Sequence, residues 1–379
     1  MSEPADPSSV PRSVLLGRDL APDPRALTAV NIGEFEAIAR ERMHPGAFDY
    51  VAGGAWDEIS LDENEAGWRR HRFRPRVLVD VGATDPSTTM LGGPVAIPLA
   101  VAPMAVHGLA HPLGEIATSR AAAAAGVPFT LSTMSSASIE AVAEGAPGGR
   151  RWFQLYVQAR PNQSRELVER AAASGFEAIV LTVDLPILGY RERDRRSGFD
   201  LAVPLGNFTT DEGPSHRLDV PGYEVLEAWG RRSLIWDDIA VIRSWSQLPL
   251  VVKGILTAED AHLAVEHGAQ AIVVSNHGAR QLDRTVTPLG ALPEVVAAIG
   301  DRAEVWVDGG VRRGLDIAIA LALGARGVLL GRPVFWALAA GGQPAVERAL
   351  AIVREEFEIA MALLGTPTVA DITRAHLVG

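Results

Sequence analysis

The feature that most constrains the fold is a repeat of eight short apolar runs, each followed by a helical pattern of residues. We expect these runs to form strands at residues 95–101, 129–132, 152–157, 178–183, 248–252, 271–274, 304–307 and 327–330. Strands that alternate with helices pair in parallel, and eight such units favour a closed (β/α)8 TIM barrel of the α/β class. An open doubly wound sheet is the alternative. Such a sheet usually carries a Gly-x-Gly-x-x-Gly turn, whereas this sequence has no Gly-x-Gly.

Other segments flank or interrupt this repeat. The proline-rich residues 1–30 predict a disordered or loosely draped arm, and residues 31–379 are expected to form one domain. Phe35, Ile38 and Met43 recur at helical spacing, which predicts an N-terminal helical cap. Residues 77–80 indicate an antiparallel or capping element. Between the fourth and fifth strands, about residues 186–235 are rich in proline, glycine and charge, which is typical of an active-site lid.

The composition excludes several kinds of site. The chain has no cysteine, so disulfides, cysteine-ligated metals and a thiol nucleophile are ruled out, and we expect no metal site. A formal net charge of -11 argues against nucleic-acid and anionic-membrane partners. No apolar run approaches the length needed to span a bilayer, and the 186–235 insertion has no apolar-basic amphipathic helix. We therefore expect a soluble, cytoplasmic protein.

Polar side chains follow nearly every predicted strand, where a barrel places its chemistry. They are Ser132, Gln154, Tyr156, Thr182, Asp184, Lys253, residues 275–280, residues 308–312, Gly331 and Arg332. The two-residue spacing of Gln154 and Tyr156 puts both on one face of a strand. The sorting of polar groups to one rim favours a functional site over scattered surface polarity.

Residues 275–281, Ser-Asn-His-Gly-Ala-Arg-Gln, place a candidate base, His277, beside a candidate anion receptor, Arg280. This pair suits a substrate with a carboxylate and an acidic proton, although a polar loop with a solvated arginine is the simpler alternative. Glycines and arginines at 309–312 and 331–332 predict a phosphate site. Lys253 would stabilise negative charge on a reduced flavin, or it could form a structural ion pair with an aspartate.

These motifs together resemble the FMN-dependent 2-hydroxy acid oxidases and dehydrogenases, the family of glycolate oxidase, lactate oxidase and mandelate dehydrogenase. The resemblance runs from about Ile32 to the C-terminus. Its most specific motif is residues 275–283, and the motifs at 48–50, 153–157, 181–184, 252–254, 308–314 and 331–333 support it. It implies a barrel that binds FMN and assembles as a homotetramer or octamer.

The resemblance also implies residue roles. The FMN contacts are Pro103, Met104, Ala105, Ser132, Gln154, Thr182, Lys253, Ser275, Asp308, Gly309, Gly310, Val311, Arg312, Gly331 and Arg332. The catalytic residues are His277 as the base, Asp184 as its orienting carboxylate, Tyr156 near the reacting hydroxyl, and Lys253. The residues around the substrate are Tyr50, Met134, Tyr156, Arg191, His277 and Arg280.

The implied reaction is oxidation of an (S)-2-hydroxy acid to the 2-oxo acid, with reoxidation by O2 to give H2O2. Met134 replaces the tryptophan of glycolate oxidases, and Met104 replaces a small residue beside the flavin. The first departure favours larger or aromatic acids of the mandelate or 4-hydroxymandelate type. The alternatives are a small-acid glycolate or lactate oxidase, a dehydrogenase with another acceptor, a flavin barrel acting on a phosphorylated compound, or a flavoprotein that has lost catalysis.

Overall fold

The computed structural model describes residues 21–160, 162–198, 203–208 and 230–378 of the chain. Eight parallel strands close into a barrel in the order β10-β3-β4-β5-β6-β7-β8-β9. This confirms the predicted (β/α)8 barrel. The strands are β3 Leu99–Met104, β4 Phe129–Ser132, β5 Arg151–Leu155, β6 Ala178–Thr182, β7 Leu250–Ile255, β8 Ala271–Val274, β9 Glu304–Val307 and β10 Gly327–Leu330.

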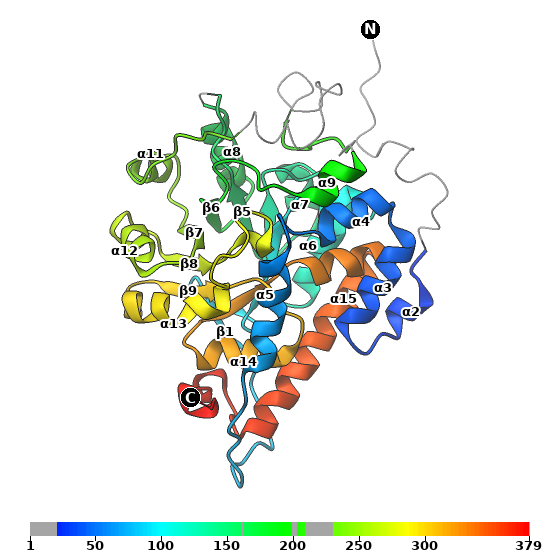
Figure 1. The fold of residues 1–379 in the computed structure, drawn as a ribbon, viewed down its shortest axis with the longest axis vertical. Coiled ribbons are helices and arrows are strands. Elements are labelled where there is room, and N and C mark those ends of the chain that lie inside the picture. The colour runs from blue at the N-terminus through cyan, green and yellow to red at the C-terminus, as the bar shows by residue number, and fades with distance from the viewer. Residues whose placement is uncertain (1–20, 161, 199–202, 209–229, 379) are drawn as a thin grey trace.

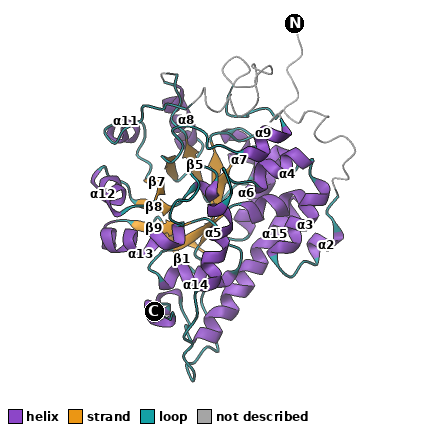
Figure 2. Cartoon of the chain, in the orientation of Figure 1, coloured by secondary structure: helices purple, strands orange, loops and turns teal. Residues whose placement is uncertain are grey.

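Helices surround the barrel on its outer face (Figures 1 and 2). Those that follow barrel strands are α6 Gly114–Ala124, α7 Ile139–Gly145, α8 Gln163–Ala173, α9 Glu192–Ser197, α11 Asp238–Ser244, α12 Ala258–Glu266, α13 Pro288–Ile299, α14 Gly314–Ala322 and α15 Arg332–Leu364. Thr257 caps α12, because its side chain accepts from the backbone N–H of Asp260. The long α15 is kinked at Gly341 and Gly342, where Gly342 has φ +63°.

The N-terminal cap consists of α2 Pro24–Leu27, α3 Ile32–Arg42, α4 Pro45–Ala52 and α5 Ile59–Arg70. Phe35 and Ile38 are buried on the predicted face of α3, which packs against α15. Ala26 and Ala29 are also buried, and α2 packs on α15 as well. Residues 1–20 of the proline-rich arm lie outside the described residues.

Two expectations near residues 77–101, an antiparallel or capping element at 77–80 and one strand at 95–101, were partly wrong. Residues 77–80 form a loop in which Val77 and Leu78 are exposed, so they pair with no strand. The antiparallel element is instead the hairpin of β1 Thr88–Met90 and β2 Gly93–Val95. The strand expected at 95–101 is two strands, because Pro98 has no backbone N–H to continue a ladder and falls between β2 and β3.

The barrel interior explains how the strands present polar side chains at one end. The interior layer nearer the amino ends of the strands is apolar and contains Trp152 and Trp306, whose rings stack with centroids 4.8 Å apart. Met90 and Val95 of the hairpin pack into the same layer. Side chains two residues further along a strand face the same way. Gln154 and Asp308 therefore lie one layer nearer the carboxyl ends of the strands than the tryptophans. Thr182, Lys253 and Ser275 likewise come two residues after an apolar interior residue of their own strands.

The insertion expected at 186–235 is described only in part. Asn207 holds residues 203–208 against the end of β4, because its Nδ2 donates to Thr133 O at 3.0 Å and its Oδ1 accepts from Ile139 N at 2.9 Å. The rest of the insertion, residues 199–202 and 209–229, lies outside the described residues. Of the helices in the described chain, none combines the length and apolar character needed to cross a membrane.

Candidate active site

A cavity of about 560 Å³ opens at the carboxyl ends of the barrel strands. Most of the predicted site residues line it: Tyr50, Pro103, Met104, Ala105, Ser132, Met134, Tyr156, Thr182, Arg191, Lys253, His277, Arg280, Asp308, Gly309, Gly310, Val311, Arg312, Gly331 and Arg332. Gln154, Asp184 and Ser275 are not among the lining residues. Each is bonded to a residue that is, Gln154 to Thr182, Asp184 to His277 and Ser275 to Lys253.

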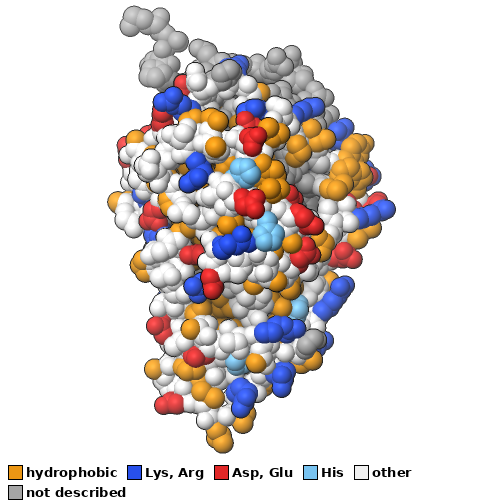
Figure 3. Space-filling model, turned by 90° about the vertical axis from the view of Figure 1, so that its left-hand side faces the viewer, with side chains coloured by type: hydrophobic (Ala, Val, Ile, Leu, Met, Phe, Trp, Pro, Cys, Tyr) orange, Lys and Arg blue, Asp and Glu red, His pale blue; other side chains and the backbone are white. Residues whose placement is uncertain are grey.

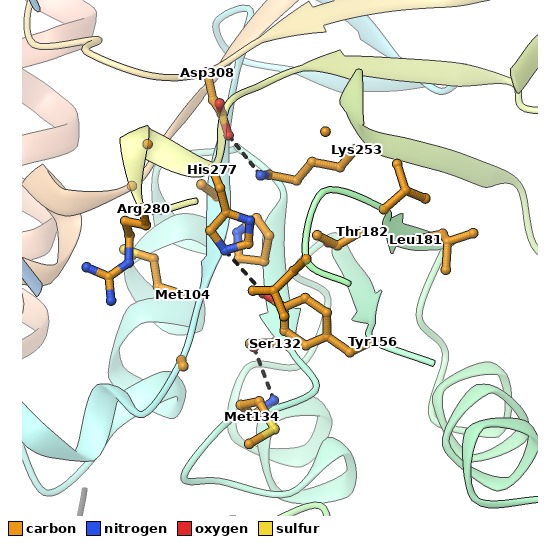
Figure 4. Close-up of a pocket in the computed structure, with 18 of the residues that line it drawn as sticks. Met104, Ser132, Met134, Tyr156, Leu181, Thr182, Lys253, His277, Arg280 and Asp308 are labelled. Atoms are coloured by element: carbon orange, nitrogen blue, oxygen red, sulfur yellow. Dashed lines mark hydrogen bonds and ion pairs between the residues drawn. The ribbon is translucent and has the colours of Figure 1, made fainter. Parts of the chain in front are cut away.

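His277 lies between a carboxylate and a phenol. Its Nδ1 is 2.7 Å from Asp184 Oδ1, and its Nε2 is 3.3 Å from the Tyr156 hydroxyl. An ionised Asp184 accepts a hydrogen bond from the Nδ1–H of His277, which leaves Nε2 without a proton and therefore as the basic atom. Figure 4 shows His277 between Tyr156 and the Lys253–Asp308 pair. This arrangement is that of a general base with an orienting carboxylate.

Burial and neighbouring charges shift the pKa values of His277, Asp184 and Tyr156. Burial lowers the pKa of His277 below its ordinary 6.5 and outweighs the opposing effect of Asp184, so the imidazole is neutral near pH 7. Burial raises the pKa of Asp184, but His277 and Lys253 outweigh it and hold this carboxyl ionised. The pKa of Tyr156 is raised by burial and by Asp184, so the phenol keeps its proton. One neutral base and one protonated hydroxyl therefore face the cavity.

The loop that carries His277 is strained and braced from outside the barrel. His277 and Ala279, in the short 3-10 helix η3 His277–Ala279, have φ of 59° and 63°, which non-glycine residues adopt only at a cost. Asn276 exchanges two 2.9 Å hydrogen bonds with Asn64 of α5. Asp283 caps the start of the same helix by accepting from Ser60 N at 2.8 Å. Sequence reasoning did not identify Asn64, because nothing near position 64 signals contact with a loop so distant in sequence.

Three guanidinium groups make the cavity strongly cationic. Arg280 donates to Tyr50 O and Gly53 O, and its guanidinium carbon is 4.9 Å from the centre of the Tyr50 ring. Arg332 donates to Gly53 O at 2.9 Å. Arg191 is buried and donates to Arg280 O at 3.1 Å. In the described part of the chain no ion pair joins these three arginines to a carboxylate, and their donors go to neutral oxygens.

The charge on these arginines is costly without an anion. Burial, followed by the charge of Arg280, lowers the pKa of Arg191 to about 10 and that of Arg332 to about 9. A buried cation without a counterion is unfavourable, and a bound anion relieves that cost. The cavity is therefore suited to anionic ligands, such as a carboxylate or a phosphate.

Lys253 lies on the side of His277 opposite to Arg280 (Figure 4). Its Nζ donates to Ser275 Oγ at 2.9 Å and pairs with Asp308 Oδ2 at 3.2 Å. Burial opposes the charged form of Lys253, but Asp308 and Asp184 outweigh this, so its pKa is raised. The ion pair that the sequence left open is thus present, and Lys253 still lines the cavity. Asp308 Oδ1 is buried without a hydrogen-bond partner in the described residues.

The predicted phosphate loops are close-packed. Gly310 has φ +80°, and a Cβ added there would lie 2.1 Å from Asn64 O, so only glycine fits. Arg312 pairs with Glu65 at 2.8 Å and its guanidinium lies over the Trp336 ring. Arg312 is thus partly neutralised, whereas Arg332 is not.

Several apolar side chains also line the cavity. Met134 is buried beside Ser132, whose Oγ accepts from Met134 N at 3.1 Å (Figure 4). Leu188, Leu234 and Trp236 line the same cavity. Sequence reasoning missed these three because they lie around the insertion, where no strand pattern predicts their direction.

Comparison with known proteins gives consistent matches. A family model described as FMN-dependent dehydrogenase matches residues 39–379. L-lactate oxidase of Nostoc sp. is 48% identical over 357 residues, which cover 92% of this chain and 98% of that protein. Glycolate oxidase of Spinacia oleracea is 47% identical over 352 residues, or 92% and 95% of the two chains. A structure of mandelate oxidase with (S)-4-hydroxymandelic acid has a TM-score of 0.87 at 43% identity and covers 92% of this chain and 98% of that one.

Proposed function

The chain belongs to the FMN-dependent dehydrogenase family, among the 2-hydroxy acid oxidases, and on this premise we propose that it oxidises an (S)-2-hydroxy acid to the 2-oxo acid. The observation that carries the proposal is His277, held by Asp184 at 2.7 Å, in one cavity with Arg191 and Arg280. A base beside two cations that lack carboxylate partners in the described chain matches a substrate with a carboxylate next to its reacting carbon.

The cavity fits FMN. Asp308 Oδ1 has no partner in the described residues, Arg332 has no counterion there, and Gly309 and Gly310 line the cavity, where a phosphate needs backbone donors. We assign the phosphate to the 309–312 and 331–332 loops and the ring to Lys253 and the end of β3. Bound FMN would supply the acceptor for the two electrons and for the second hydrogen that the substrate loses beside the proton taken by His277. Lys253, whose charge is held by Asp308, would stabilise negative charge on the ring.

The chain's own residues perform the acid–base work. Arg280, Arg191 and Tyr50 orient the substrate by its carboxylate, which places the hydroxyl-bearing carbon near His277. Nε2 of His277 accepts a proton as the alcohol loses two electrons, and Asp184 stabilises the resulting imidazolium. The Tyr156 hydroxyl, 3.3 Å from Nε2, hydrogen-bonds the reacting oxygen.

We further propose that the substrate is a larger or aromatic acid of the mandelate or 4-hydroxymandelate type. Met134, Leu188 and Trp236 are apolar residues that line the cavity, and the similar mandelate oxidase structure holds (S)-4-hydroxymandelic acid. The second candidate is a small-acid oxidase, which is supported by the lactate and glycolate oxidases at 48% and 47% identity.

The electron acceptor, location and assembly are also proposals. O2 as acceptor, giving H2O2, is supported by the relatives named as oxidases. The family resemblance supports a homo-oligomer of four or eight chains and a single FMN-binding domain at 31–379. The composition of the chain supports a cytoplasmic location, and the proline, glycine and charge content of residues 186–235 supports a lid there. One relative is named as peroxisomal, which is the alternative location.

The test is anaerobic reduction of the bound flavin. We expect a yellow protein whose absorbance near 450 nm is bleached by an (S)-2-hydroxy acid and restored by O2 with formation of H2O2. His277→Gln should bind FMN equally but be bleached about 10²–10⁴-fold more slowly, because it lacks the base. Equal bleaching rates in the two proteins, or no bleaching of the native protein by any 2-hydroxy acid, would overturn the proposal.

A further inference from the structure

We infer that Gln281 is a positioning residue that holds Asp184 and Arg191 in place relative to His277. Its side chain is buried and all the hydrogen-bonding capacity of its amide is used. Nε2 donates to Asp184 O at 3.0 Å and to Ile187 O at 2.8 Å. Oε1 accepts from Gly189 N at 3.2 Å and from Arg191 Nη2 at 3.3 Å.

The segment that Gln281 holds carries two site residues but no helix or strand of its own. Residues 183–191 connect β6 to α9, with Asp184 near one end and Arg191 at the other. At Gly189 an added Cβ would lie 2.4 Å from Arg280 O, so this segment lies directly against the chain that follows His277. Gln281 is the side chain that bonds both ends of the segment, and we expect the distance between the two ends to depend on it.

The four contacts require a side chain that both donates and accepts hydrogen bonds, as an amide does. Two neighbouring carbonyl oxygens need two donors, and a backbone N–H and a guanidinium need an acceptor at the same side chain. A glutamate would keep the acceptor but place its second oxygen against Asp184 O and Ile187 O. A methionine of similar length would keep neither set of contacts. These two substitutions therefore separate the Asp184 contact from the Arg191 contact.

The inference rests on the proposed roles of His277 and Arg191. Asp184 raises the pKa of His277 against the larger lowering by burial. If Asp184 moves away, the pKa of His277 falls further and the acid limb of the pH profile moves to lower pH. If Arg191 moves away, the carboxylate of the substrate or product binds more weakly.

The experiment compares Gln281→Met and Gln281→Glu with the native holoenzyme. We measure the rate of anaerobic flavin reduction against pH, and the Kd of the 2-oxo acid benzoylformate from its perturbation of the flavin spectrum. Gln281→Met should slow reduction about 10- to 100-fold, move the acid limb to lower pH and raise the Kd about tenfold. Gln281→Glu should slow reduction but keep the Kd within about threefold, because its remaining oxygen still accepts from Arg191.

Two controls keep the outcome specific. Gln343→Met removes an amide whose hydrogen bond in the described part of the chain goes to Glu347, one turn along α15, and it should change neither reduction nor Kd. In an Asp184→Ala background, Gln281→Met should slow reduction at saturating substrate less than about threefold, because its effect on this rate acts through Asp184, whereas its effect on Arg191 appears in the Kd. If the two substitutions slow reduction by fully additive amounts, the inference is overturned. It is also overturned if Gln281→Met leaves both the acid limb of the pH profile and the Kd unchanged. If Gln281→Met does not fold, Gln281→Asn, whose amide is one carbon too short, replaces it.

The product-binding measurement also separates this inference from the proposed function. It requires bound FMN and a carboxylate ligand but no turnover. If native protein is not reduced by 2-hydroxy acids, the proposed function fails. A raised benzoylformate Kd in Gln281→Met would still support the Arg191 contact, and the ¹⁵N chemical shifts of the His277 ring against pH would still report its pKa.

Discussion

We expect the side chain of Met134 to determine which size of substrate the enzyme prefers. It is buried in the cavity wall at the end of β4, where the resemblance places tryptophan in glycolate oxidases. We expect the native enzyme to prefer mandelate or 2-hydroxyoctanoate over glycolate in kcat/KM. Met134→Trp should reverse this order by roughly 10- to 200-fold, because one fitted apolar group contributes about 1–3 kcal/mol.

Met134→Leu, which conserves side-chain volume, should keep the native order. If glycolate is already the best native substrate, or if Met134→Trp leaves the order unchanged, Met134 does not control substrate size. A neighbour such as Leu188 would then fill the space.

Individual site residues were predictable to different degrees. Lys253 lies within β7 and Asp308 directly follows β9, so alternation along a strand determines which way their side chains face. His277 and Arg280 lie in the loop after β8 and were predicted from their place at the end of a strand. The partners of these residues were less predictable. The sequence could not show that Arg312 pairs with Glu65 on α5, because that contact depends on how the cap docks on the barrel.

Strand β7 contains an irregularity that makes room for Asp184. The β7–β8 register shifts between Lys253 and Ile255, and Gly254 at this point has φ +109°. A Cβ at Gly254 would lie 2.6 Å from Asp184 Cβ and 2.9 Å from its Oδ2. A strand with any other residue there would push the carboxylate away from His277.

We therefore expect Gly254→Ala to reduce kcat about 10- to 100-fold, because a small displacement of a catalytic group is costly, and to lower Tm as well. Gly175→Ala is the matched control, since Gly175 has φ +75° and no atom within 4 Å of the added Cβ. It should lower Tm by backbone strain alone and leave kcat unchanged. Normal kcat in Gly254→Ala would show that the space at β7 is not needed.

Elements were predicted best where their periodicity is strong. All eight barrel strands occur at the expected places, since buried parallel strands are continuous apolar runs. The boundary errors fall at Pro98 and at the exposed residues 77–80, where local apolar character suggested a strand but no partner strand is available.

For the whole molecule, buried histidines make stability depend on pH. Burial lowers the pKa of His107 below its ordinary 6.5 and outweighs the opposing charge of Glu115. Because the folded-state pKa is the lower one, the unfolded chain binds the proton more readily. The contribution of His107 is fully present above about pH 6.5 and is lost as pH falls through the folded-state pKa.

Thermal unfolding of the holoenzyme should thus show a lower Tm at pH 5.5 than at pH 7.5. His107→Gln should be less stable at pH 7.5 but show a smaller change between the two pH values. Asp316, whose pKa is raised to about 6 by burial, acts in the opposite direction, so the difference between native protein and variant is the quantity to measure. An identical pH dependence in both proteins would contradict the role of His107.

The surface does not show a concentration of charge on the face drawn in Figure 3. Figure 3 shows acidic and basic side chains interspersed over one face of the molecule, beside scattered apolar ones. The net charge of -11 is therefore not gathered into one patch on this face.

The placement of the site around the barrel also bears on how the chain becomes active. His277 and Asp184 are 93 residues apart in sequence, and His277 and Tyr156 are 121 apart. Contacts of such separation form only after long loops have closed, and this makes them late and slow events in folding. Neither half of the chain contains the complete site. A nascent chain therefore has the complete set of site residues only after β10 and Arg332 have joined the barrel, so a partly synthesised chain would lack the activity proposed above.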